Sequence, residues 1–270
     1  MAYLQLQDIM LHYEETGSGQ PLLLIAGLGG DLQSWSQHIS DFSKTHRVIA
    51  FDNRGSGQTS APDRPYTIAQ MANDTLKLLD HLEIPATHVL SFSLLGGAIA
   101  LQLALKDPTR TERLAMIAPG GTLDNASISI LNSWIAAKRS NLSKEALIRL
   151  TSSFLYSRTF LNDETLFKSM IDTTSSNKFE QPDHAFIRQA EAILNWQPPN
   201  DLSMVSNPVL LLNSLEDQLV TPEQVNQLTE SLPNCNNKQL EGGHAGLFEL
   251  PEIYRASILE FFDAARVKES

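Results

Sequence analysis

The sequence has little of several features that define whole classes of protein. A single cysteine, Cys235, among 270 residues excludes an internal disulfide and a metal site built from several thiolates. No apolar run approaches the ~20 residues that a membrane-spanning helix needs, so we expect no membrane insertion. Residues 1–10 have neither a basic start nor a long apolar run, which predicts no signal peptide and therefore a cytoplasmic location.

Basic residues are also scarce relative to acidic ones. The chain has 20 Lys and Arg against 31 Asp and Glu, a formal net charge of −11, which disfavours nucleic acid and anionic membrane surfaces as partners. No histidine pair has metal-ligand spacing, and the glycine run at 27–30 lacks the lysine of a phosphate-binding loop. We therefore expect no metal and no cofactor, and a small molecule as partner. Nothing in these patterns specifies an oligomeric state.

What is present is an alternation of strand and helix patterns. Residues 3–7 and 9–14 alternate apolar and polar side chains, which predicts an antiparallel pair at a sheet edge. Continuous apolar runs, typical of strands buried on both faces, lie at 21–26, 46–51, 88–92, 114–118 and 208–213. Helical spacing between them, as at 67–82, predicts an α/β fold with a mostly parallel, doubly wound sheet. A short strand at 237–241 and a helix at 253–265 complete the pattern.

The alternation stops between residues 122 and 200. This stretch has no strong strand pattern, and its helical segments lie at 128–138, 144–156, 164–172 and 184–196. We interpret it as a helical lid inserted into one core domain. The predicted boundaries are 1–121 and 201–270 for the core and 122–200 for the lid.

The strand at 88–92 passes into a helical pattern with no loop between them. Such a sharp turn is typical of a nucleophile elbow, and the residue at its tip is Ser93. The usual motif has small residues two positions before and two after the serine, whereas this chain has Ser91 and Leu95 there. A frame shifted by one residue would put Leu94 at the tip and leave no nucleophile. We prefer the Ser93 frame, in which a local bulge or a shifted helix start accommodates Leu95.

Three polar residues follow the ends of three proposed parallel strands. They are Ser93, Asp217 and His244. Ligands bind at this edge of an open α/β sheet. A serine hydroxyl needs a base within hydrogen-bond reach, a histidine can take and return the proton, and a carboxylate can orient the histidine. The chain order Ser, Asp, His is that of one particular fold.

The chain resembles the α/β-hydrolases along nearly its whole length. The resemblance rests on residues 26–30 with Trp35, on 51–57, on the elbow, on Glu216-Asp217 and on 242–244. Among the subgroups it most resembles small esterase-like members such as 3-oxoadipate enol-lactonases and pimeloyl-carrier-protein methyl ester esterases. The resemblance implies an oxyanion hole made by the backbone N–H groups of Leu28 and Leu94. It also favours Asp217 over Glu216 as the acid, because Asp217 matches the family position.

The resulting prediction is a serine esterase or lactonase that works through an acyl-enzyme. Two alternatives stay open. One is a carbon–carbon bond hydrolase or perhydrolase with the same triad. The other is a non-catalytic binding protein with a degenerate elbow, which we would favour if Ser93 were not at a strained tip or if its Oγ lay beyond about 3.5 Å from His244.

Other polar residues are expected to have no part in catalysis. Asp52 and Arg54 are interpreted as a loop-ordering pair. The remaining histidines are expected at the surface or at strand starts, namely His12, His38, His46, His81, His88 and His184.

Overall fold

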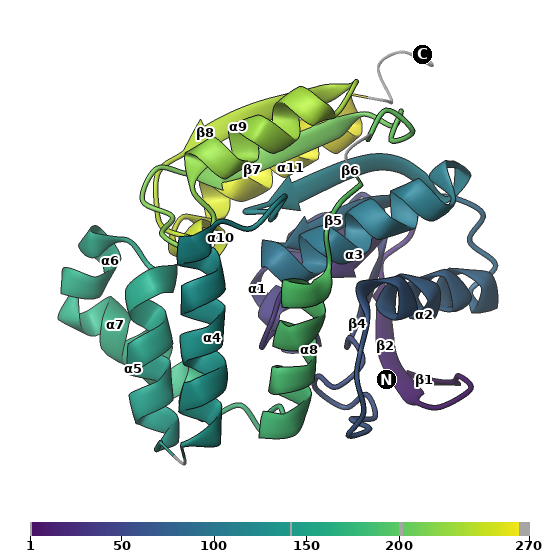
Figure 1. Cartoon of the computed structure of the whole chain (residues 1–270). Coiled ribbons are helices and arrows are strands. Elements are labelled where there is room, and N and C mark those ends of the chain that lie inside the picture. Colours follow the sequence, from purple (N-terminus) through teal and green to yellow (C-terminus); the bar gives the residue numbers. More distant parts are fainter. Residues whose placement is uncertain (1, 141, 200–201, 265–270) are drawn as a thin grey trace.

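An eight-stranded sheet forms the centre of the molecule (Figure 1). The computed structural model describes residues 2–140, 142–199 and 202–264. The strand order is β1-β2-β4-β3-β5-β6-β7-β8. The first two strands pair antiparallel at one edge, β2 pairs antiparallel with β4, and the other pairings are parallel. This confirms the predicted fold class, a mostly parallel α/β sheet that begins with an antiparallel pair.

The strands lie within a few residues of the predicted ranges. Their bounds are β1 Ala2–Gln5, β2 Met10–Thr16, β3 Gln20–Ile25, β4 His46–Phe51, β5 Thr87–Phe92, β6 Thr111–Ile117, β7 Val209–Ser214 and β8 Cys235–Leu240. The side chains of β3 from Leu22 to Ile25 and all of β7 are buried, because helices cover both faces of the sheet.

Helices connect the parallel strands and form the two outer layers. The core helices are η1 Leu32–Trp35, α1 Ser36–Phe42, α2 Ile68–His81, α3 Ser93–Lys106, η2 Pro108–Arg110, α9 Pro222–Ser231, α10 Gly246–Glu249 and α11 Pro251–Asp263. Helices α2, α3 and α9 contribute to one apolar cluster, on one face of the sheet. Helices α1, α10 and α11 contribute to a second cluster on the opposite face. The sheet is therefore covered on both sides, as a doubly wound fold requires.

Among the described residues between β6 and β7, the stretch predicted as an insertion forms five helices. They are α4 Asn125–Arg139, α5 Lys144–Leu155, α6 Arg158–Asn162, α7 Glu164–Ser175 and α8 Asp183–Asn195. Figure 1 shows α4 to α7 grouped at one side of the molecule, with α8 between α4 and α3, both of which it contacts. The short helix α6 was not predicted. Its start is defined by Ser157, whose hydroxyl accepts a hydrogen bond from the N–H of Phe160 at 3.2 Å.

The expected surface position of some histidines is wrong. His12 and His38 are fully buried, one in the second strand and one in α1. His12 Nδ1 lies 2.8 Å from an Asp52 oxygen, which satisfies a polar group inside the core. His38 packs near the rings of Phe42 and Phe248, and burial lowers its pKa to about 4. The tertiary partners of these residues are set by the fold, so local patterns did not reveal the burial.

Candidate active site

The turn between β5 and α3 has the geometry predicted for the elbow. Strand β5 ends at Phe92, and α3 begins at the next residue. Ser93 has a φ of +65°, in the left-handed region that non-glycine residues rarely adopt. Strain of this kind is retained where the surrounding structure fixes it, and it is typical of functional positions. Ser93 is therefore at a strained tip.

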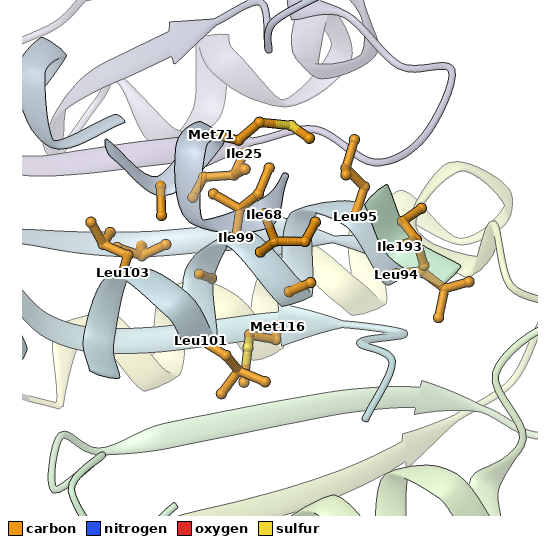
Figure 2. Packing of buried hydrophobic residues seen from close by; sticks show 14 of the residues in the cluster. Ile25, Ile68, Met71, Leu94, Leu95, Ile99, Leu101, Leu103, Met116 and Ile193 are labelled. Atoms are coloured by element: carbon orange, nitrogen blue, oxygen red, sulfur yellow. The ribbon is translucent and has the colours of Figure 1, made fainter. Parts of the chain in front are cut away.

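Leu95 is accommodated differently from our expectation. The helix start is not shifted, because α3 begins at Ser93. No bulge lies at the turn either, since β5 pairs regularly with β6 from Val89 to Phe92, and the register shift in this pairing lies at the other end of the strand, between Thr87 and Val89. The Leu95 side chain is fully buried in the same apolar cluster as Ile193 of α8, and both are labelled in Figure 2. Helix α8 thus offers a hydrophobic environment for a side chain that the usual motif excludes.

Two glycines that follow Leu95 relieve the crowding between α3 and its neighbours. A Cβ at Gly96 would lie 2.7 Å from the carbonyl oxygen of Ile25 at the end of β3. A Cβ at Gly97 would lie 2.9 Å from the Cβ of Pro119. In the usual motif, a glycine two positions after the serine permits a close approach of this kind. In this chain the close approach occurs at positions 96 and 97 instead. The altered motif is consistent with an intact turn.

A chain of two hydrogen bonds joins the three residues predicted for the triad. His244 Nε2 lies 2.7 Å from Ser93 Oγ, and His244 Nδ1 lies 2.8 Å from Asp217 Oδ2. All three residues are buried. The structure therefore brings His244 together with side chains that are 27 and 151 positions away in the sequence.

The loop after β7 fixes the carboxylate of Asp217. Its Oδ1 accepts hydrogen bonds from the N–H groups of Leu219 at 2.9 Å and Val220 at 2.8 Å. Its Oδ2 is thereby left facing the histidine. The neighbouring Glu216 has a different partner, because its Oε2 accepts the N–H of Arg158 at 3.1 Å. Of the two acids considered from the sequence, Asp217 is the one in contact with His244.

The glycine loop after β3 lies directly against the elbow. A Cβ at Gly27 would lie only 2.7 Å from the Cβ of Ser93, so this close approach requires glycine. The next residue, Leu28, lines the same pocket as Ser93 and Leu94. Leu94 is the second residue of α3, where backbone N–H groups have no acceptor within the helix. Both residues predicted for the oxyanion hole are thus close to the serine.

The pocket above Ser93 is small and apolar. It has a volume of about 100 Å³, and apart from Ser93 and His244 its lining consists of Leu28, Phe92, Leu94, Leu131, Trp134, Leu155, Tyr156, Leu219, Ala245 and Phe248. Burial raises the pKa of Tyr156 to about 12, so its hydroxyl stays protonated. No charged side chain outside the triad is among these residues, which favours a neutral group in this space.

A second cavity of about 170 Å³ shares Trp134 with this pocket as a lining residue. Its lining is more polar and includes Lys138, Lys144 and Glu180. Each lysine already has a carboxylate partner. Lys138 Nζ is 2.7 Å from Asp183, and Lys144 Nζ is 3.1 Å from Glu180.

The loop at residues 52–60 supports the glycine loop, although its residues are not paired as expected. Asp52 Oδ1 accepts the N–H of Leu32 at 2.7 Å, and Asn53 Nδ2 donates to the carbonyl of Ala26 at 3.0 Å. Arg54 instead forms buried ion pairs with Asp8 and Asp74. The interpretation of Asp52 and Arg54 as one pair is therefore wrong. Each orders the loop through its own partners, several of which are distant in sequence.

The part of the chain that the structure describes contains no group of three His, Cys, Asp or Glu side chains that could hold a metal ion. Within the same residues, no helix is long and apolar enough to cross a membrane.

Comparison with known proteins assigns the family. Residues 20–251 match the model of the alpha/beta hydrolase fold, so the chain belongs to that family. RutD of Caulobacter sp. strain K31, named as a carbamate hydrolase, is 28% identical over 93% of each chain. 3-Oxoadipate enol-lactonase 2 of Acinetobacter baylyi is 27% identical over 93% of this chain and 92% of its own. The family resemblance noted in the sequence, including that to enol-lactonases, is confirmed.

Solved structures agree with this assignment at the level of fold. The enol-lactonase of Burkholderia xenovorans LB400 superposes with a TM-score of 0.87 at 23% identity, covering 97% of this chain and 99% of its own. A hydrolase from Pseudomonas aeruginosa gives a TM-score of 0.88 at 23% identity over 97% of each chain. The named relatives, taken with the family, support hydrolase activity.

Proposed function

We propose that this protein is a serine hydrolase that cleaves a small carboxylic ester or lactone through an acyl-enzyme. The observation that carries the proposal is the continuous hydrogen-bonded chain from Ser93 Oγ through His244 to Asp217, with Ser93 at a φ of +65°. In this proposal Ser93 is the nucleophile, His244 the general base, and Asp217 the residue that orients the imidazole.

The acylation step follows from these contacts. Ser93 Oγ forms a bond to the acyl carbon while its proton passes to His244 Nε2, 2.7 Å away. The carbonyl oxygen becomes an oxyanion, which the N–H groups of Leu28 and Leu94 stabilise. Loss of one such donor typically lowers the rate about 10²–10³-fold. The tetrahedral intermediate then releases the alcohol, which takes the proton from His244.

The deacylation step uses the same groups in a second cycle. His244 removes a proton from water, whose oxygen bonds to the acyl carbon of the Ser93 ester. The Oγ–carbon bond breaks, the acid leaves, and the proton returns from His244 to Ser93. Asp217 stabilises the imidazolium and holds its orientation, while its Oδ1 accepts two backbone N–H groups. A lactone opens by the same steps, with its alcohol still attached to the acyl group.

The size of the pocket favours a substrate with a short acyl group. Its volume of about 100 Å³ is smaller than the cavity of about 150 Å³ that is known to hold benzene in another protein. The apolar lining disfavours a charged acyl chain. We also propose that residues 122–200 form a lid that controls access, because Leu131, Trp134, Leu155 and Tyr156 all lie in this segment and line the pocket.

The geometry argues against a non-catalytic binding protein. That alternative requires either a relaxed Ser93 backbone or a gap beyond about 3.5 Å to His244. Ser93 has a positive φ, and the distance to His244 is 2.7 Å.

The test is covalent labelling with a fluorophosphonate probe, read by intact mass and peptide mapping. We expect one adduct at Ser93, lost in Ser93→Ala and in His244→Ala. The matched control is Ser91→Ala, a buried serine two residues earlier in β5 that we expect to leave labelling unchanged. Activity on p-nitrophenyl acetate should exceed that on the octanoate. Folded wild-type protein that remains unlabelled would rule out the mechanism.

A further inference from the structure

Glu249, at the end of α10, is hydrogen-bonded to two segments that each supply residues to the wall of the active-site pocket. Its Oε1 accepts the N–H of Gly243 at 3.0 Å, one residue before His244. The same oxygen accepts the N–H of Ser157 at 3.0 Å, and Oε2 accepts the Ser157 hydroxyl. A single carboxylate thus binds donors from two segments far apart in the sequence, the loop that carries His244 and the connection between α5 and α6.

This connection, residues 155–158, is here called the α5–α6 strap. It is pressed closely onto the histidine loop. The N–H of Ala245 donates to the carbonyl of Leu155 at 2.7 Å. A Cβ at Gly243 would lie 2.7 Å from the backbone nitrogen of Ser157 and 2.8 Å from the carbonyl oxygen of Leu155. Glycine at position 243 is required for the two backbones to approach so closely, which holds Gly243 N–H within reach of Glu249.

The strap is also tied to the loop that carries Asp217. The N–H of Arg158 donates to Glu216 Oε2 at 3.1 Å, and the N–H of Glu216 donates to the carbonyl of Gly242 at 3.0 Å. Two acids outside the triad therefore bind the strap: Glu216 from the loop that carries Asp217, and Glu249 at the end of α10, the helix that follows the histidine loop. Of the two acids, Glu249 is the one whose side chain also binds the residue directly before His244, namely Gly243.

The consequence for the pocket is geometric. Leu155 and Tyr156 of the strap line the pocket together with His244 and Ala245 of the histidine loop. A change in how the strap sits on this loop therefore alters the wall of the pocket and the position of the imidazole together. A misplacement of about 1 Å at a reacting group can lower a rate about 10²-fold.

We propose that Glu249 is a positioning residue that joins the α5–α6 strap to the histidine loop and thereby holds His244 in line with Ser93. This inference rests on the proposed serine hydrolase function. Glu249 acts through the backbone N–H groups of Gly243 and Ser157 and does not itself contact the reacting atoms. Its carboxylate is suited to this role because an ionised acceptor binds N–H donors more strongly than a neutral one.

The decisive variants are Glu249→Leu and Glu249→Gln. Leucine has a similar size but no acceptor, so both N–H groups lose their partner. Glutamine keeps one oxygen, which can still face both N–H groups, while its amide can donate to the Ser157 hydroxyl. We expect Glu249→Leu to lower kcat for p-nitrophenyl acetate and the fluorophosphonate labelling rate by the same factor, about 10–100-fold. KM should change less than about threefold, and Glu249→Gln should recover most of the loss.

The matched control is Glu252→Leu, three residues further on, where the side chain is 88% exposed. We expect it to keep kcat within about twofold of wild type. A Glu249→Leu protein with unchanged kcat and labelling rate would overturn the inference, as would a loss that Glu249→Gln does not restore.

A second variant keeps the inference testable if Glu249→Leu does not fold. In that case Ser157→Ala is the variant to measure. We expect its kcat to be about threefold to tenfold lower than that of wild type, because one charge-assisted hydrogen bond to Glu249 is lost. An unchanged kcat would overturn the inference. Unlabelled wild-type protein would overturn the proposed function itself, together with this inference. Labelled wild type with an unaffected Glu249→Leu overturns the inference alone.

Discussion

Replacing Asp217 by asparagine isolates the role of the carboxylate. In the structure Asp217 Oδ1 accepts two backbone N–H groups, from Leu219 and Val220. Only an oxygen can accept them, so these bonds would orient the side-chain amide of the Asp217→Asn variant with its oxygen in place of Oδ1. Its NH₂ group then takes the place of Oδ2, which in the wild type lies 2.8 Å from His244 Nδ1.

The consequence of Asp217→Asn is a reversed histidine tautomer. An NH₂ group at this place donates to Nδ1, so the imidazole proton moves to Nε2, the nitrogen that faces Ser93. A protonated Nε2 is unable to accept the serine proton. In a serine protease the same change lowers kcat about 10⁴-fold, which corresponds to about 5 kcal/mol in the activation free energy. We expect a loss of this size here, with the fold retained because both N–H groups keep an acceptor.

The assay is steady-state hydrolysis of p-nitrophenyl acetate near neutral pH, with the fluorophosphonate labelling rate measured alongside. The matched control is Glu216→Gln, the neighbouring acid, whose amide oxygen can still accept the N–H of Arg158. We expect this variant to stay within about threefold of wild type. An Asp217→Asn protein that keeps more than about a tenth of the wild-type kcat would refute the tautomer argument. A larger loss in Glu216→Gln than in Asp217→Asn would show that the wrong acid had been assigned.

Two further predictions concern the elbow and the core. Gly27→Ala places a Cβ 2.7 Å from the Cβ of Ser93, so we expect kcat to fall about 10²-fold or more. The control in the same assay is Gly121→Ala, whose Cβ would meet nothing closer than 3.6 Å. Equal kcat values for the two variants would contradict the claim that the glycine loop touches the elbow. His38 has a pKa lowered from 6.5 to about 4 by burial, so the unfolded chain binds more protons between these values and stability falls as the pH drops through that window. We expect His38 to lower the free energy of unfolding by about 2–3 kcal/mol at about pH 4.5 relative to about pH 7.5, as measured by urea unfolding. His38→Leu should remove this contribution to the pH dependence. If the free energy of unfolding changed equally between the two pH values in wild type and in His38→Leu, the assignment to His38 would be contradicted.

Much of the fold was predictable because burial leaves a local pattern in the sequence. A strand covered on both faces needs consecutive apolar residues, so the runs at 21–26 and 208–213 predicted β3 and β7. The strand order was not predictable in this way. Strand β4 lies between β2 and β3, and that arrangement depends on which helix crosses which face of the sheet.

The candidate site was predictable for a related reason. Ser93, Asp217 and His244 each follow a strand end, and the ends of parallel strands meet at one edge of the sheet. What the pattern missed was the accommodation of Leu95. The predicted bulge was unnecessary because α8 supplies an apolar environment, and α8 lies far from Leu95 along the chain.

The sequence by itself determined the alternation of strands and helices, the strained turn at Ser93 and the order of the three polar residues. Each of these depends on neighbours in the chain, through backbone conformation or the spacing of apolar side chains. The tertiary structure alone decided that His12 and His38 are buried, that Asp52 and Arg54 have separate partners, and that Glu249 binds Ser157 across 92 residues. These contacts form between segments that come together only when the sheet has assembled. The sequence around a polar side chain therefore does not indicate which partner it will have in the folded protein.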